Sequence, residues 1–106
     1  MNASTGRRRA PDHASGIMAK VEIYTSIMCP YCTSAVGLLQ SKNINFEQID
    51  VSMSGALRRT MRSRASGRAS VPQIFIDDEH IGGCDDLMAL DTAGHLDVLL
   101  NRPASK

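Results

Sequence analysis

The chain has 106 residues, of which 42% are hydrophobic and 22% charged, and its formal net charge is +1. This length allows one small domain with a core, and the balanced charge argues against a nucleic-acid-binding protein. No apolar run is long enough to span a membrane, so we expect neither nucleic acid nor a membrane as partner. Three cysteines are an odd number, which argues against a secreted disulfide framework and favours a reducing compartment, the cytoplasm.

Residues 1–17 are mostly polar or small, include three consecutive arginines, and lack the apolar surface that offsets the entropy of chain ordering. We predict a disordered N-terminal tail at 1–17, a folded domain at 18–101 and a short C-terminal tail at 102–106. No apolar segment follows the arginines, so no secretory signal is predicted. A transit peptide, to which the composition has a weak similarity, and a protein start at Met18 are alternatives.

The patterns predict, in chain order, a strand at 20–26, a helix after residue 32 that ends near residue 43, a strand at 44–50, a basic helix at 53–67, a strand at 73–77, a turn at 78–79, a strand from residue 80 and a C-terminal helix to residue 100. In the first strand, Val21 and Ile23 face one side, and Glu22 and Tyr24 the other. Ser52 is the expected N-cap of the basic helix. The strand–helix–strand opening implies a right-handed crossover between parallel strands. We therefore predict an α/β fold of order βαβαββα, with a mixed four-stranded sheet flanked by helices.

The stretch IMCPYC places Cys29 and Cys32 three positions apart where the first strand meets the first helix. There the Cys29 sulfur faces unpaired helical N–H groups and the positive end of the helix dipole, which favour thiolate over thiol. Pro30 suits the first helical turn, where its missing N–H costs nothing. Cys32 lies one turn further in, close enough to attack a mixed disulfide on Cys29. The pattern predicts a nucleophile and a resolving thiol.

A metal clamp is the main alternative for these cysteines. Zinc needs four ligands, and Cys84 with His80 or His95 would complete the set begun by Cys29 and Cys32. The sequence lacks a second closely spaced Cys/His pair, and a CxxC in a βαβ context favours redox chemistry. We therefore expect no metal ligands, a small buried packing role for Cys84, and surface or turn positions for the two histidines.

A second signal lies in SVPQIF, where Pro72 directly precedes the third strand. The Val71–Pro72 bond is a natural place for a cis peptide, although a trans bond is commoner for an isolated Val-Pro pair. In the cis geometry, the main-chain carbonyl and N–H of Val71 are free beside the cysteine loop. They can then pair with an extended peptide, as an added strand does.

Three motifs in order, VEIYTSIMCPYC, SVPQIF and IDDEHIGGCDDLMALD, resemble the glutaredoxins of the small bacterial dithiol type over about residues 18–101. The resemblance implies a thioredoxin-like fold and a glutathione-dependent disulfide oxidoreductase, active in electron transport and cell redox homeostasis. Its substrates are protein disulfides and glutathione mixed disulfides. Glutathione is then a co-substrate and no cofactor is tightly bound. The implied partners are glutathione and disulfide-containing or glutathionylated proteins, and we expect a monomer.

By the same resemblance, Cys29 forms the mixed disulfide with glutathione and Cys32 resolves protein disulfides. The glutathione-binding residues that it implies are Tyr31, Arg59, Val71, Pro72, Asp85 and Asp86. Val71 would bind the cysteinyl backbone, and the N–H groups at Asp85 and Asp86 would bind the γ-glutamyl carboxylate at a helix N-terminus. An Asp side chain would bind the γ-glutamyl ammonium group.

Arginines dominate the segment between Val51 and Ile76, which contains no acidic residue. Such a field would favour the approach of glutathione, a small anion. Arg59 matches the family position that meets the glycyl carboxylate, with a solvated helix face as the alternative. For Arg62 and Arg64 the solvated face is the favoured interpretation.

The sequence departs from the family pattern at Ser26, where these proteins commonly have Lys, and at Ser70, where Thr is usual. Two other functions remain open. One is an iron–sulfur carrier that bridges a [2Fe–2S] cluster between monomers, although dedicated carriers typically replace the second cysteine by serine. The other is a thioredoxin with a reductase as donor, which the absence of a Trp-Cys-Gly-Pro-Cys motif disfavours.

Overall fold

A computed structural model describes residues 19–101, so the tails predicted at 1–17 and 102–106 lie outside the described residues. The elements in chain order are β1 (Val21–Thr25), α1 (Pro30–Ser41), β2 (Glu47–Asp50), α2 (Gly55–Arg64), β3 (Gln73–Ile76), β4 (Glu79–Gly82), α3 (Cys84–Thr92) and α4 (His95–Asn101). One sheet has the order β2-β1-β3-β4, with β1 and β2 parallel and the other neighbours antiparallel. This confirms the predicted mixed four-stranded sheet. Within the described residues, no helix has the length and apolar character needed to cross a membrane.

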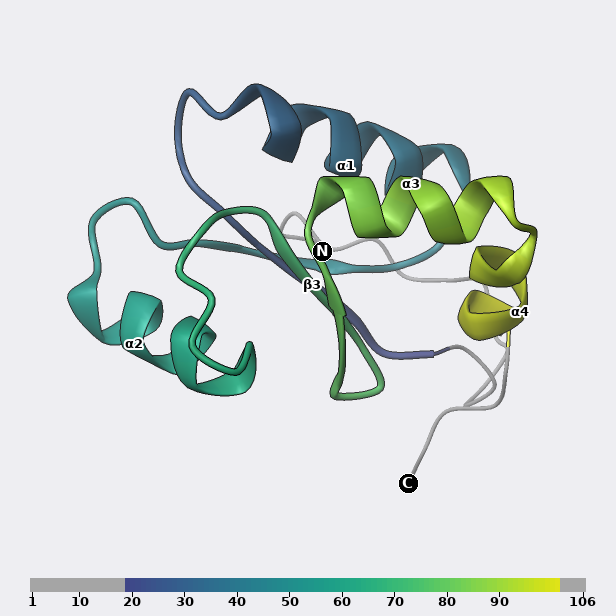
Figure 1. The fold of residues 1–106 in the computed structure, drawn as a ribbon. Helices are drawn as coiled ribbons and strands as arrows, with labels where there is room; N and C mark the ends of the chain where they lie inside the picture. Colours follow the sequence, from purple (N-terminus) through teal and green to yellow (C-terminus); the bar gives the residue numbers. More distant parts are fainter. Residues whose placement is uncertain (1–18, 102–106) are drawn as a thin grey trace.

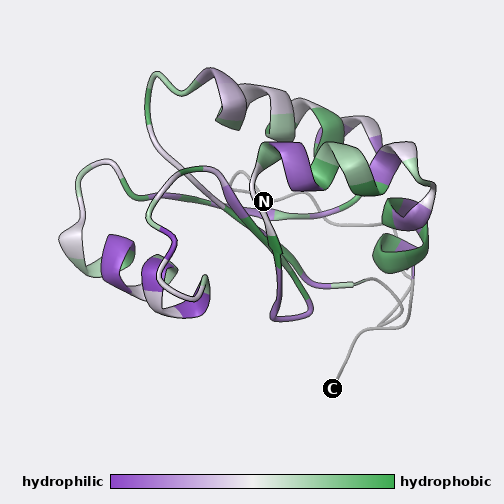
Figure 2. Cartoon of the chain, in the orientation of Figure 1, coloured by the Kyte–Doolittle hydropathy of each residue, from purple (hydrophilic) through white to green (hydrophobic). Residues whose placement is uncertain are grey.

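Helices cover both faces of the sheet, with α1 and α3 on one face and α2 on the other (Figure 1). The α1/α3 face buries an aliphatic core, with contributions from β1, β3, α1, α3 and α4: Val21, Ile23, Ala35, Leu39, Ile74, Ile76, Leu87, Leu96 and Leu100. On the other face, Tyr24 and Phe75 of the sheet pack with Met61 of α2. All five residues of β1 are therefore buried. Figure 2 shows this apolar centre and hydrophilic residues on α2.

The predicted helix boundaries are wrong in three places, one of which is the end of the basic helix, at Arg64 rather than residue 67. Ser54, rather than Ser52, caps α2, because its Oγ accepts the N–H of Leu57 at 3.0 Å. The Ser52 hydroxyl instead accepts the N–H of Ile27 at 2.7 Å, which ties the loop after β2 to the loop after β1. The predicted C-terminal helix is two helices, α3 and α4, separated at Gly94, whose φ of 81° is one that L side chains rarely adopt.

The strand ends also differ from the predicted ones. β2 begins at Glu47 rather than residue 44, although Ile44 and Phe46 still pack against the aliphatic core from the preceding loop. The turn between β3 and β4 lies at Asp77 and Asp78, one position earlier than predicted. Both residues have positive φ, at 53° and 68°, which is the geometry of a tight two-residue hairpin.

Lys42, at the C-terminal end of α1, joins this helix to α3 and α4. Its Nζ lies 2.6 Å from Asp91 Oδ1 and 2.9 Å from Asp97 Oδ1. A helix of 12 residues is about 18 Å long, so these ion pairs lie far from the N-terminal end of α1. Lys42 therefore contributes to packing and stands apart from the cysteine pair.

Candidate active site

Cys29 is the N-cap residue of α1. Its backbone is extended, with φ −115° and ψ 104°, and its Sγ accepts the N–H of Cys32 at 3.2 Å. Met28, with φ 55°, turns the chain from β1 toward the helix, and Pro30 begins α1. A sulfur that accepts a helical N–H at the positive end of the dipole favours negative charge. Since Cys29 is only partly buried, the site combines a favourable field with access from solvent.

Cys32 lies one turn further along α1 and is buried, with 4% of its surface exposed. Burial raises the pKa of the Cys32 thiol to about 11, and the hydrogen bond and charge of the Cys29 side chain add to the increase. Cys32 is therefore a protonated thiol at neutral pH, and Cys29 is the more accessible of the two sulfurs. The third cysteine, Cys84, is buried as predicted, and burial raises its pKa as well.

The loop at residues 65–72, between α2 and β3, meets the cysteine pair; we name it the proline loop. Its Val71–Pro72 peptide bond is cis. The Val71 carbonyl oxygen lies 3.8 Å from Cys29 Sγ and can accept the thiol proton, although the two residues are 42 positions apart in the chain. Tyr31 is 64% exposed. The fold thus brings Cys29, Val71 and Pro72 together and leaves Tyr31 open to solvent.

The Gly82–Gly83 turn, which leads into α3, lies against the proline loop. A Cβ at Gly83 would be only 3.4 Å from the carbonyl oxygen of Pro72. Asp86 Oδ2 accepts the Gly83 N–H at 2.9 Å, so the Asp86 carboxylate caps α3. Asp85 and Asp86 are exposed in the first turn, and the start of a helix offers unpaired N–H groups to an anion.

Arg68 is the arginine that lies at this turn, a position for which no arginine was predicted. Arg68 Nη1 lies 3.5 Å from Asp86 Oδ2, and its Nη2 lies beside Gly83. Arg59 is exposed on α2, with its guanidinium near the first turn of the same helix. Among residues 19–101 we find no hydrogen bond or ion pair from Arg59 to the proline loop or the glycine turn. The sequence signal that could have identified Arg68 is its place within the proline loop itself.

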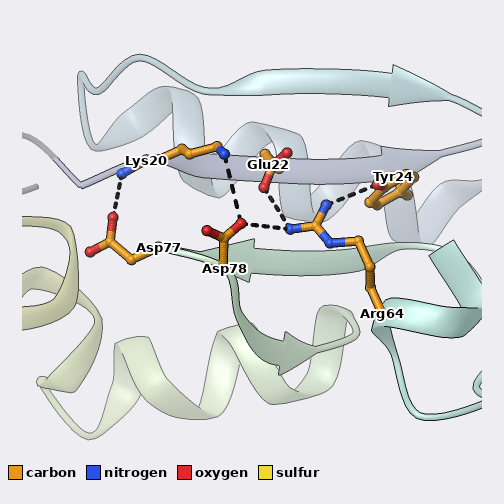
Figure 3. A network of polar contacts seen from close by, with 6 residues as sticks. All are labelled: Lys20, Glu22, Tyr24, Arg64, Asp77 and Asp78. Carbon is orange, nitrogen blue, oxygen red and sulfur yellow. Dashed lines mark hydrogen bonds and ion pairs between the residues drawn. The ribbon is translucent and has the colours of Figure 1, made fainter. Parts of the chain in front are cut away.

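Arg64 belongs to a polar network, and its prediction as part of a solvated helix face is wrong. Its guanidinium donates to Glu22 Oε1 at 2.8 Å, Tyr24 Oη at 2.9 Å and Asp78 Oδ1 at 3.2 Å (Figure 3). It also lies over the Phe75 ring, 4.1 Å from the centroid. The Arg64 and Glu22 side chains are only 24% and 11% exposed. Arg64 therefore holds α2 on the sheet, and its charge is neutralised locally.

The two predicted surface histidines differ in their environments. His95 is exposed at the start of α4, as predicted. His80 lies on β4 and is partly exposed, and its Nε2 lies 2.6 Å from Oε1 of Gln73. In the part of the chain that the structure describes, no group of three or more His, Cys, Asp or Glu side chains could hold a metal ion.

Apolar side chains are exposed around Cys29. Ile27, Met28 and Tyr31 are 65%, 94% and 64% exposed, and Met53, which follows the serine bonded to Ile27, is 94% exposed. Cys29 and Met28 also line a groove of about 630 Å³ that runs along α1. An exposed apolar patch beside a partly exposed sulfur is suited to contact with another molecule.

A cysteine pair one helical turn apart, at the start of the first helix and facing a cis-proline loop, defines a thiol–disulfide oxidoreductase of thioredoxin-like fold. Comparison with known proteins agrees. The family model named Glutaredoxin matches residues 21–81. Glutaredoxin 3 of Escherichia coli is 57% identical over 83 residues, which cover 78% of this chain and 99% of that protein.

Solved structures give the same result. The glutaredoxin of Brucella melitensis is 51% identical, with a TM-score of 0.72, and the match covers 81% of this chain and 92% of that one. A buckwheat glutaredoxin–glutathione complex is 25% identical, with a TM-score of 0.70, covering 77% of this chain and 76% of that one. The chain belongs to the glutaredoxin family.

Proposed function

We propose that the protein is a glutathione-dependent oxidoreductase that reduces glutathione mixed disulfides and protein disulfides through Cys29 and Cys32. The observation that carries this proposal is the unequal environment of the two sulfurs. Cys29 is partly exposed and accepts a helical N–H, while Cys32 is buried and its pKa is raised to about 11. Cys29 is suited to attack the disulfide of a substrate, and Cys32 is suited to attack the mixed disulfide that then forms on Cys29.

In the reduction of a glutathione mixed disulfide, the Cys29 thiolate attacks the glutathione sulfur. The substrate S–S bond breaks, and its electron pair leaves with the protein substrate as a thiolate, which takes a proton from water. Cys29 is then joined to glutathione. A second glutathione thiolate attacks the glutathione sulfur of this bond, which releases oxidised glutathione and restores the Cys29 thiolate. Cys32 takes no part in this cycle.

In the reduction of a protein disulfide, Cys29 attacks one substrate sulfur and the other leaves as a thiolate. Cys32 then loses its proton and attacks the Cys29 sulfur, which frees the second substrate thiolate and leaves a Cys29–Cys32 disulfide. Two glutathione molecules reduce this disulfide in turn. The exposed apolar patch at Ile27, Met28 and Met53 supports contact with protein substrates.

Glutathione binding is proposed for the residues that surround Cys29. The Val71 main chain and Pro72 would pair with the cysteinyl backbone, and Tyr31 would lie against the ligand. The first turn of α3, at Asp85 and Asp86, would hold the γ-glutamyl end, a role that its helix N-terminus supports.

Two arginines are candidates to bind the anionic groups of glutathione. Arg59 stays a candidate for the glycyl carboxylate through the family pattern. Arg68 is the stronger candidate for an anionic group of glutathione, because its guanidinium already lies at the turn beside Asp86. We place the protein, as a monomer, in the cytoplasm, where glutathione is kept reduced.

The proposal is tested by reduction of a glutathione–cysteine-peptide mixed disulfide and, separately, of a protein disulfide, with glutathione as the sole donor. Cys29→Ser should abolish both reactions. Cys32→Ser should retain the first and lose most of the second. Cys84→Ser is the matched control and should retain both, since that thiol is buried at the start of α3. Activity in the Cys29→Ser protein would overturn the catalytic assignment.

A further inference from the structure

Gln73 is a polar side chain with none of its surface exposed, and both ends of its amide are bonded. Its Nε2 lies 3.0 Å from the carbonyl oxygen of Ser70 and 3.3 Å from Ser70 Oγ. Its Oε1 lies 2.6 Å from His80 Nε2. A buried amide group left unbonded costs about 1–3 kcal/mol, so this arrangement is strongly favoured over any that breaks one of these bonds.

The hydrogen bonds determine the orientation of the amide. Gln73 Nε2 donates to Ser70, at the carbonyl oxygen and at the hydroxyl, so Oε1 faces His80 and the His80 ring donates from Nε2. The reverse orientation would set Oε1 against the Ser70 carbonyl, with two acceptors opposed. Burial lowers the pKa of His80, and the charge of Arg68 adds to the decrease, so the ring is neutral at pH 7 with one N–H.

The hydrogen bonds from Gln73 to Ser70 also determine the direction of the Val71 N–H. The carbonyl of Ser70 and the N–H of Val71 belong to one planar peptide group. This peptide is trans, so its N–H points opposite to its C=O. Because Gln73 holds the carbonyl toward the interior, the Val71 N–H is directed outward. Within residues 19–101 that N–H has no hydrogen-bond partner.

We propose that Gln73 and His80 are positioning residues for the bound substrate. His80 orients the Gln73 amide, the amide holds the Ser70–Val71 peptide plane, and the plane presents its N–H to the main chain of a glutathionyl substrate beside Cys29. This inference rests on the proposed function and adds two residues that do not touch the substrate. The stretch VPQIFIDDEHI carries both, seven positions apart, on β3 and β4.

Two substitutions at residue 80 separate this role from simple packing. His80→Phe keeps an aromatic ring against Phe75, whose centroid lies 5.1 Å from the histidine ring, but removes the N–H donor. His80→Gln loses the ring and keeps an N–H donor of similar reach. Gln73→Met removes the amide itself. Lys42→Met, which breaks ion pairs at the far end of α1, is the control for a general loss of stability.

With the glutathione–cysteine-peptide mixed disulfide as probe, His80→Phe and Gln73→Met should raise KM about tenfold, the equivalent of one well-placed hydrogen bond, with kcat within about twofold. His80→Gln and Lys42→Met should stay within about twofold in both constants. Alkylation of Cys29 by iodoacetamide should be unchanged in all four variants. A wild-type KM in the His80→Phe protein, or a larger rise in His80→Gln than in His80→Phe, would overturn the inference.

NMR provides a second measurement that does not depend on turnover. The side-chain amide protons of Gln73 should exchange slowly with solvent in the wild-type and His80→Gln proteins and faster in His80→Phe. Equal exchange in all three would also overturn the inference. Wild-type protein without activity on the mixed disulfide would instead overturn the proposed function, so the two failures are distinguishable.

Discussion

Cys32 is predicted to be unreactive while the Cys29 sulfur is free and to become reactive once Cys29 has formed a mixed disulfide. Burial is the larger cause of the raised pKa of Cys32, and the hydrogen bond and charge of Cys29 come next. Removal of the Cys29 sulfur eliminates the contribution of Cys29 to the raised pKa and leaves the contribution of burial. Cys29→Ser should therefore lower the pKa of Cys32 from about 11 toward, but not to, the ordinary value of 9.0.

The magnitude follows from the ionised fraction. A thiol with a pKa of about 11 is ionised in about one molecule in ten thousand at pH 7, against about one in a hundred for an ordinary thiol. The ionised fraction of the buried thiol is thus about a hundredfold lower than that of an ordinary thiol. Formation of a mixed disulfide on Cys29 removes the part of this decrease that the Cys29 side chain causes. The resolving step is then fast only after substrate has bound covalently.

The assay is a pH titration that follows the Cβ chemical shift of Cys32 by NMR. The wild-type midpoint should lie near pH 11, and the Cys29→Ser midpoint should lie clearly lower. Cys84→Ser is the control, because that thiol makes the smallest contribution to the raised value, and its midpoint should move much less. A wild-type midpoint near 9, or no change in Cys29→Ser, would show that Cys29 does not control the ionisation of Cys32.

Two further predictions concern stability. Arg64→Met leaves the Glu22 carboxylate buried without its partner and should lower the free energy of unfolding by about 3 kcal/mol, measured by urea denaturation. The double variant Arg64→Met/Glu22→Leu should recover most of that loss. A double variant as unstable as Arg64→Met alone would show that the unpaired Glu22 carboxylate is not the cause of the loss. Ser54→Ala should cost about 1 kcal/mol through the lost cap of α2, and no loss would show that Ser54 does not stabilise the helix.

Much of the site could be predicted because its signals are local. The Cys29–Pro30–Tyr31–Cys32 stretch combines an N-cap sulfur, a first-turn proline and a second thiol one turn on, and these follow from helix geometry alone. The alternating strands and their short connections likewise determine the mixed sheet. A Val-Pro pair before a strand indicated where a loop would meet the cysteines, and Val71 lies 3.8 Å from Cys29.

The parts that could not be predicted depend on contacts between distant segments. Nothing in the α2 sequence distinguishes Arg64, which reaches Glu22 across 42 positions, from the exposed Arg62. The candidacy of Arg68 as a ligand for an anionic group of glutathione depends on the packing of the proline loop against the Gly82–Gly83 turn, which the sequence does not show. His80 becomes a partner of Gln73 only when β3 and β4 pair in their bulged register.

The central claim is that Cys29 is the accessible, reactive sulfur and that Cys32 and Cys84 are not. It is tested most directly by brief alkylation of the reduced protein with limiting iodoacetamide at pH 7, followed by mass spectrometry of the peptides. We expect modification of Cys29 well before either buried thiol. Preferential modification of Cys32 or Cys84, or equal rates at all three, would contradict it.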